Sequence, residues 1–335
     1  MTKKELLQLF KKFASLKVMV IGDVMIDAYL HGKVERISPE APVPVVALRK
    51  RENKLGGAAN VALNLRSFCA QTILCSVIGN DRQGEELINL MQNSGLQTDG
   101  ILKSQARITT TKFRIIGNKM QILRVDEEID DDLSKNDSVL FLGLVSKLIK
   151  NQKPDIIILQ DYNKGVLTEN IIQEIIRLAS IEMIPVVADP KKKNFSVYKG
   201  IGLFKPNLLE ITEGLKMEVD PNSMEDLRKA ASHLHESQEI ELVMITLSEY
   251  GVFMSQRTSE GSITYKIPAF LRKIADVSGA GDTVISVAAL CLAAGCDNSF
   301  IGTLSNLAGG LVCEQAGVIP IDKSKLVAEA LKVLC

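Results

Sequence analysis

Short runs of β-branched and apolar residues alternate with longer helical stretches along most of the chain, and this alternation constrains the fold most strongly. Strands are predicted at residues 18–22, 72–78, 156–160, 185–189, 202–205 and 242–246. Helices are predicted at 1–16, 61–68, 81–93, 135–150, 168–180, 223–236, 282–294, 300–316 and 323–334. Strands that alternate with helices indicate βαβ units, so we expect an α/β fold with a mainly parallel sheet covered on both faces.

Two segments do not fit a βαβ unit. Residues 42–48 read as an extended, proline-bearing stretch, and residues 109–125 read as a hairpin that turns at Gly117 and Asn118. Together they predict a small separate sheet that acts as a lid over the strand ends. We therefore expect one domain over residues 1–335, with lid segments at about 31–54 and 106–126.

The charge balance and the hydropathy pattern exclude several functions. The 335 residues carry 40 Lys plus Arg and 40 Asp plus Glu, so no overall positive field attracts nucleic acid or an anionic membrane. No apolar run reaches the roughly 18 residues of a membrane-spanning helix. The six cysteines lack metal-ligand spacing, which indicates buried free thiols in a reducing cytoplasm. His31, His233 and His235 form no cluster, and we expect them on the surface.

The segment 276–283 (DVSGAGDT) is the strongest candidate for chemistry. Its glycines lead into a helix, and free N–H groups at a helix N-terminus form a ready site for an anion. Asp282 would repel a phosphate there unless it takes a proton from the nucleophile that attacks the phosphate. The same pattern also fits a plain N-cap with glycines for tight packing, and the local sequence leaves both interpretations open.

Two further segments contain groups that bind polyols. Gly56, Gly57 and Asn60 (in GGAAN) allow close backbone approach and supply a polar side chain, or they form a small-residue contact between helix and sheet. Asp23 and Asp27 follow the first strand and either accept hydrogen bonds from sugar hydroxyls or cap a loop.

Another polar segment, 205–210 (KPNLLE), also follows a strand. Asn207 and Glu210 are placed to reach a hydrated Mg²⁺ or nucleotide phosphates, or they begin a helix. Lys112, Arg114 and Arg124 in the predicted hairpin either bring charge to a substrate phosphate or are solvated surface charges. Lys164 and Lys191 follow predicted strands, and each is either a charge that binds a ligand or a solvated surface charge.

These segments together resemble a known family. Residues 55–65 (LGGAANVALNL) and 276–283 resemble the two signatures of the ribokinase-like (PfkB) carbohydrate kinases. Residues 36–46 (RISPEAPVPVV) bring the resemblance closest to the D-glycero-β-D-manno-heptose-7-phosphate kinases of lipopolysaccharide-core synthesis. The motifs GDVMIDAY, QDYNKG, DPK and KPNLLE occur in the same order, and the resemblance covers about residues 15 to 320. It implies a three-layer α/β/α sandwich with a small β-sheet lid.

The resemblance also implies roles for individual residues. Asp282 would be the catalytic base, and the amides of Gly279, Ala280 and Gly281 would form the anion hole. The sugar phosphate would be bound by Asp27, Gly56, Gly57, Asn60, Lys112 and Arg124. The ATP side would be formed by Lys191, Asn207, Leu208, Leu209, Glu210, Thr246, Gly251 and Asn306, with Glu210 reaching Mg²⁺ through water. The chain departs from the family pattern at Ser248, where a glycine is usual.

The activity implied by the resemblance is transfer of the ATP γ-phosphoryl group to O1 of the heptose 7-phosphate, giving the 1,7-bisphosphate for ADP-heptose synthesis. We expect an ordinary Asp282 pKa of about 3.9, a Mg²⁺ requirement and a cytoplasmic homodimer formed through the lid. A monovalent-cation requirement stays open. Many of these kinases carry a fused nucleotidyltransferase, and here we expect the kinase alone, with a separate adenylyltransferase. The alternatives are a kinase of ribose, fructose 1-phosphate or a nucleoside, and a catalytically silent regulator that binds sugar or nucleotide.

Overall fold

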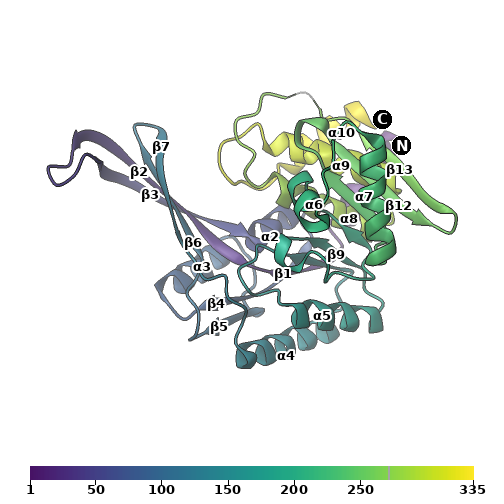
Figure 1. Cartoon of the computed structure of the whole chain (residues 1–335), viewed down its shortest axis with the longest axis horizontal. Coiled ribbons are helices and arrows are strands. Elements are labelled where there is room, and N and C mark those ends of the chain that lie inside the picture. The colour runs from purple at the N-terminus through teal and green to yellow at the C-terminus, as the bar shows by residue number, and fades with distance from the viewer. Residues whose placement is uncertain (271) are drawn as a thin grey trace.

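The computed structural model describes residues 1–270 and 272–335, and a large sheet forms its centre (Figure 1). In this described part of the chain the sheet has nine strands in the order β13-β12-β11-β10-β9-β8-β1-β4-β5. Strands β11 through β5 of this order pair in parallel, as the sequence predicts for all of them except β5, which the sequence analysis missed. Their bounds are β1 Lys17–Gly22, β4 Gln71–Gly79, β5 Ile101–Ser104, β8 Ile156–Gln160, β9 Val186–Asp189, β10 Leu203–Phe204 and β11 Leu242–Thr246.

An antiparallel hairpin that the sequence analysis did not predict completes one edge of this sheet. It consists of β12 (Val252–Thr258) and β13 (Gly261–Ile267), and β12 pairs antiparallel with β11. Only the first four residues of β12 are buried, and β13 is largely exposed. An exposed edge strand lacks the continuous apolar run that identifies a buried parallel strand, so its signal in the sequence is weak.

Helices cover both faces of the large sheet, which confirms the three-layer sandwich. Alternate side chains of β1 point to opposite faces: Val18 and Val20 join one core cluster, and Met19 and Ile21 join the other. The first cluster includes side chains of α1, α2, α3, α8, α9 and α10, and the second those of α4, α5, α6 and α7. The helices are α1 Lys3–Phe13, α2 Ala58–Ser67, α3 Arg82–Asn93, α4 Lys135–Gln152, α5 Glu169–Ile181, α6 Leu208–Leu215, α7 Met224–Ser237, α8 Ala280–Ala293, α9 Asn298–Val312 and α10 Lys323–Val333.

A second, four-stranded sheet projects from the body (Figure 1). Its order is β3-β2-β6-β7, with β2 at Val24–Ile37, β3 at Pro44–Gly57, β6 at Thr111–Gly117 and β7 at Met120–Glu127. These strands extend past the expected segments 31–54 and 106–126, because β2 and β3 continue as one long hairpin through two irregularities in register. The turn is at Asn118 and Lys119, whose φ angles are 53° and 69°, one residue later than predicted.

The environments of a histidine and several cysteines also differ from expectation. His235 is buried, and its ring nitrogens lie 2.7 Å from Ile240 O and 2.8 Å from Ser255 Oγ, because α7 packs over β12. All six cysteines are free, but Cys69 and Cys335 are exposed. Among the described residues, no helix combines the length and the apolar character needed to cross a membrane.

Candidate active site

Asp282 is a buried carboxylate at the N-terminal end of α8. Gly279 is the N-cap, with φ of 81°, and it has no side chain to cap the helix. Asp282 is therefore the third helical residue, and its oxygens accept hydrogen bonds from other elements. Only 4% of Asp282 is exposed. The alternative interpretation, in which Asp282 is a plain N-cap, is wrong.

Three donors from distant parts of the chain hold the Asp282 carboxylate. Asn60 Nδ2, on α2, donates to Oδ2 at 2.7 Å, and the Tyr162 hydroxyl donates to Oδ1 at 2.6 Å. Gln160 Nε2, at the end of β8, donates to Oδ1 at 3.3 Å. These side chains meet because the carboxyl ends of parallel strands lie at one edge of a sheet.

The pKa of Asp282 is not the ordinary value that we expected. Burial raises the pKa to about 6, because a low-dielectric environment disfavours the charged form. Hydrogen bonds from Asn60 and Tyr162 oppose this effect, the nearby Asp189 adds to it, and Lys205 opposes it. The carboxylate therefore stays ionised at pH 7 but gains a proton readily near pH 6.

The first turn of α8 supplies fewer free amides than expected. The Ala280 N–H donates to Val277 O at 3.2 Å and is not available to an anion. Among the described residues, no backbone hydrogen bond uses the Gly281 N–H. Lys205 lies beside this turn, because a Cβ added at Gly281 would be 3.7 Å from Lys205 Nζ. The buried ammonium of Lys205 therefore adds positive charge beside the free Gly281 amide.

Lys205 is itself fixed by a buried ion pair. Its Nζ lies 3.0 Å from Asp189 Oδ2, and Gln160 Nε2 donates to the same oxygen at 3.2 Å. Asp189 Oδ1 is buried and has no hydrogen-bond partner among the described residues. A buried acceptor without a partner is uncommon and fits a ligand group or a water that binds there.

A cavity of about 430 Å³ opens beside Asp282, within the usual size range of small-molecule sites. The sequence-predicted residues that line it are Lys191, Asn207, Thr246, Gly251, Gly279, Ala280, Gly281, Asp282 and Asn306. Tyr162, Asp189, Lys205 and Ser248 line it as well. Leu208, Leu209 and Glu210 do not, and Leu209 is 64% exposed on the outer side of α6.

The loop after β11 explains how the chain accommodates Ser248. Ser248 has a φ of 53°, in the left-handed region that favours glycine, so the backbone adopts there the conformation that a glycine readily takes. Gly251 has a φ of 91°, and a Cβ there would lie 2.0 Å from Ile267 O. Thr246 and Asn207 form an isolated bridge between neighbouring loops. The loop therefore lines the cavity despite the departure from the family pattern.

Glu210 is the third residue of α6 and forms a capping box with Asn207, the N-cap of this helix. Its Oε2 accepts from the Asn207 N–H at 2.8 Å, and Asn207 Oδ1 accepts from the Glu210 N–H at 2.9 Å. Its Oε1 pairs with Lys191. Burial and Asp189 raise the pKa of Glu210. Burial alone would lower the pKa of Lys191, but Asp189 and Glu210 outweigh it and raise that pKa. Both Glu210 oxygens are thus engaged, and its role toward Mg²⁺ stays a prediction.

Asp27 is a second buried carboxylate on the other side of the Gly56–Asn60 segment. A Cβ added at Gly56 would lie 2.4 Å from Asp27 Oδ2, so only glycine fits there. Arg114 donates to Asp27 Oδ1. The sequence left open whether Arg114 is a solvated surface charge, and its pairing with the buried Asp27 shows that it is not.

Asp23, the other acid of that motif, does not face a sugar. It is buried and accepts hydrogen bonds from the backbone N–H groups of Tyr162, Lys164 and Val166 at 2.9, 3.1 and 3.0 Å. These contacts fix the loop that carries Tyr162. The capping interpretation of Asp23 is therefore correct, and the sugar-binding interpretation is wrong.

The two other basic residues predicted to bind the sugar phosphate, Lys112 and Arg124, have acidic neighbours. Lys112 Nζ lies 3.0 Å from Asp126 and 2.9 Å from Glu128. The Arg124 side chain is 54% exposed and lies 3.0 Å from Asp126. Arg114 and Arg124 are directly opposite each other in the β6–β7 register. Like charges opposite one another on neighbouring strands repel, and here Asp27 and Asp126 offset part of that repulsion.

The chain is similar to known carbohydrate kinases along most of its length. A model of the pfkB family carbohydrate kinases matches residues 15–325. The chain is 37% identical over 319 residues to the bifunctional protein HldE of Desulfatibacillum aliphaticivorans, covering 95% of this chain and 63% of that protein. It is 41% identical over 276 residues to HldE of Helicobacter pylori strain J99, covering 82% and 58%. The chain thus spans less than two-thirds of the length of these relatives.

Solved structures show the same fold. A ribokinase of Arabidopsis thaliana, solved with ribose and ATP, has a TM-score of 0.71 and 18% identity, covering 95% of this chain and 99% of that one. The phosphofructokinase-2 of Escherichia coli, solved with potassium, has a TM-score of 0.75 and 18% identity, covering 94% and 99%. The chain belongs to the pfkB family of carbohydrate kinases.

Tyr162 tunes the carboxylate, and this leads to a pH prediction. Because the Tyr162 hydrogen bond lowers the Asp282 pKa, Tyr162→Phe should raise that pKa. The acidic limb of kcat/KM, expected near pH 6 in the wild type, should move up by about one pH unit. Tyr265→Phe, on exposed β13, is the matched control and should leave the limb in place. A Tyr162→Phe profile that overlays the wild type would contradict this assignment.

Proposed function

We propose that this kinase transfers the γ-phosphoryl group of ATP to O1 of D-glycero-β-D-manno-heptose 7-phosphate, giving the 1,7-bisphosphate and ADP. The observation that carries the proposal is the position of Asp282, a buried carboxylate between the Asn60 side chain and a cavity lined by Gly281 and Lys205. Asp282 accepts the proton of O1 while O1 forms a bond to the γ-phosphorus. The bond between that phosphorus and the bridging oxygen of ADP breaks.

The groups around the cavity stabilise the moving charge. The Gly281 N–H and the Lys205 ammonium are fixed before the reaction, so they lower the cost of charge on the phosphoryl group without rearranging. A Mg²⁺ bound to ATP would neutralise phosphate charge, and Asp189, through its unpartnered Oδ1, is the residue that fits its hydration shell. Among the described residues, no cluster of three or more potential metal ligands occurs.

The second sheet supplies the specificity in this proposal. Asp27 accepts hydrogen bonds from sugar hydroxyls, and Gly56 allows the sugar to approach the backbone. Arg114 and Arg124, opposite each other on β6 and β7, hold the 7-phosphate, with Lys112 nearby. A phosphate between two guanidinium groups makes charge-assisted hydrogen bonds and relieves their repulsion. The HldE names of the relatives support a heptose as the sugar.

The proposal is tested by coupled ADP release with heptose 7-phosphate, fructose 1-phosphate, ribose and a nucleoside as acceptors. We expect heptose 7-phosphate to give the highest kcat/KM. Asp282→Asn should lower kcat by roughly 10²–10⁴, the usual range for a general base, while ATP still binds in a calorimetric titration. Asp99→Asn, an exposed carboxylate outside the cavity, is the control. Near-normal turnover in Asp282→Asn would remove it from the base role.

The phosphate contact is tested separately. Arg124→Gln should raise KM for heptose 7-phosphate roughly tenfold and change KM for the unphosphorylated heptose much less, because only the first carries the phosphate. Lys112→Gln should act in the same direction but less strongly, since two carboxylates already neutralise Lys112. Lys119→Gln, at the exposed turn, is the control. Equal losses for both sugars would show that Arg124 does not recognise the phosphate.

We also propose that the enzyme is a cytoplasmic homodimer formed through the second sheet. Strands β3 and β7 are its edges, and exposed apolar side chains lie along them, namely Leu48, Met120, Ile122, Leu123 and Val125. Burying apolar surface and pairing edge strands both favour association. Light scattering should give a dimer mass for the wild type, and Leu123→Asp with Val125→Asp should shift it toward a monomer. A monomeric wild type at micromolar concentration would contradict this arrangement.

A further inference from the structure

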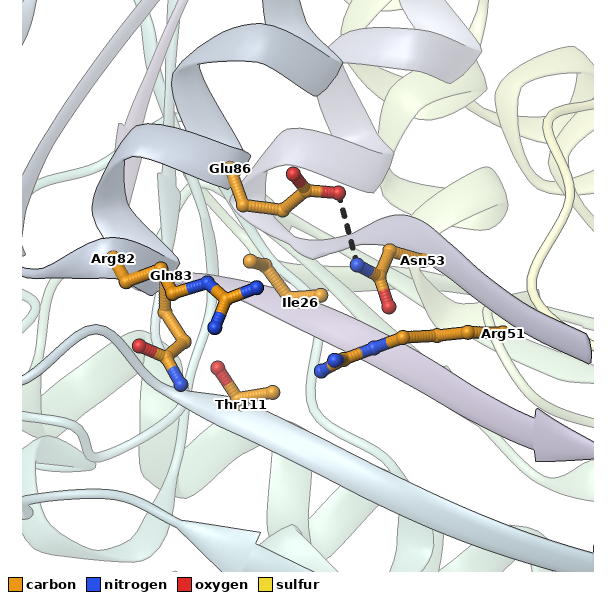
Figure 2. A pocket seen from close by; sticks show the side chains of 7 residues that line it. All are labelled: Ile26, Arg51, Asn53, Arg82, Gln83, Glu86 and Thr111. Atoms are coloured by element: carbon orange, nitrogen blue, oxygen red, sulfur yellow. Dashed lines mark hydrogen bonds between the residues drawn. The ribbon is translucent and has the colours of Figure 1, made fainter. Parts of the chain in front are cut away.

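A second cavity lies between the second sheet and α3 (Figure 2). Its volume is about 230 Å³. The polar side chains around it are Arg51, Asn53 and Thr111 from the sheet and Arg82, Gln83 and Glu86 from α3, with Ile26 beside them. Neighbouring residues of a strand point to opposite faces, so Ile26 faces this cavity while Asp27 faces the other side. This cavity is therefore separate from the candidate active site.

Two guanidinium groups converge on this cavity from opposite sides. Figure 2 shows Arg51 reaching in from β3 and Arg82 from α3. The Arg51 guanidinium lies 5.8 Å from the centre of the Phe113 ring, a contact that helps to orient it. Within residues 1–270 and 272–335, neither arginine forms an ion pair with a carboxylate. Two cations that face each other without a counterion form a favourable place for an anion.

At the other end of the cavity, Asn53 and Glu86 offer hydrogen-bond acceptors. Asn53 Nδ2 donates to Glu86 Oε1 at 2.9 Å, which fixes the orientation of the amide. Asn53 Oδ1 is buried, has no hydrogen-bond partner among the described residues and points into the cavity (Figure 2). An unpartnered buried acceptor costs free energy that a ligand hydroxyl would recover. Glu86 also accepts hydrogen bonds and repels a second negative group at this end.

We propose that this cavity binds a small phosphate monoester that carries free hydroxyl groups, the chemical class of a sugar phosphate or a polyol phosphate. The phosphoryl group lies between Arg51 and Arg82, and a hydroxyl group donates to Asn53 Oδ1. Glu86 disfavours a ligand with negative charge at both ends. The site thus selects a molecule with one anionic and one hydroxylated end over inorganic phosphate.

A ligand in this cavity would connect the second sheet to the body of the protein. Arg51 belongs to the second sheet and Arg82 to α3 of the body, so a phosphate that contacts both ties the two parts together. Ile26 and Thr111 beside the cavity adjoin Asp27 and Lys112 on the opposite face of the same strands. An occupant therefore restrains the strands that carry the proposed sugar-binding residues.

Glycerol 3-phosphate is a suitable probe, titrated calorimetrically at low ionic strength because the guanidinium groups are exposed to salt. Arg51→Gln with Arg82→Gln should weaken its binding by roughly tenfold or more. Arg36→Gln removes an exposed guanidinium elsewhere on the same sheet and should leave binding unchanged. Arg114→Gln, on the opposite face, should also retain it. Binding that is lost in Arg114→Gln but kept in the double variant would assign the probe to the active site and overturn the proposal.

Two further measurements make the test independent of the double variant. Asn53→Ala should reduce the preference for glycerol 3-phosphate over inorganic phosphate, because the hydroxyl acceptor is removed. In the unmodified enzyme, saturating glycerol 3-phosphate should slow amide hydrogen exchange in residues 82–86 and 51–53. Protection confined to the surroundings of Asp282, or no binding at all, would refute the site. These are binding experiments, so they stand even if the enzyme phosphorylates a sugar other than the proposed heptose.

Discussion

The enclosure of the Asp282 carboxylate is the interaction on which the rest of the site depends. Burying a charge is unfavourable unless hydrogen bonds and nearby charges compensate, and here Asn60, Tyr162 and Gln160 donate to the two oxygens. Compensation is incomplete, since burial still raises the pKa to about 6. A carboxylate of this kind is ionised at neutral pH but holds a proton more strongly than a solvated aspartate. This balance fits the role of general base that we propose for Asp282.

The architecture of the large sheet makes this enclosure possible. Gln160, Asp189 and Lys205 end or follow three adjacent parallel strands, and α8 brings Asp282 to the same edge. Each helix end or strand end contributes one side chain, so no single segment holds the site. The Gly56–Asn60 segment then links the two buried acids, with Gly56 against Asp27 and Asn60 against Asp282.

Periodicity predicted most helices and the parallel strands other than β5, because the strands it found are buried on both faces and their apolar runs are continuous. It failed where burial is one-sided, as in β12 and β13, and for His235, whose burial depends on how α7 packs over β12. The glycine motif located Asp282, but its pKa follows from three-dimensional contacts that spacing does not encode. Tyr162 and Lys205 lie in the motifs QDYNKG and KPNLLE, which follow predicted strands. Such a motif locates a residue along the chain but does not show whether its side chain points into the site.

The second sheet joins these observations, because its two faces carry different chemistry. Period-two alternation places Asp27 and Arg114 on one face, and it places their strand neighbours Ile26 and Phe113 on the other face, together with Asn53. A hydrogen-bonded sheet resists independent movement of neighbouring residues, so a ligand that held Arg51 against α3, as we propose, would also restrain the backbone at Asp27. The link from the proposed second site to Asp27 would then run through adjacent residues of the same strands, without a separate chain of side-chain contacts.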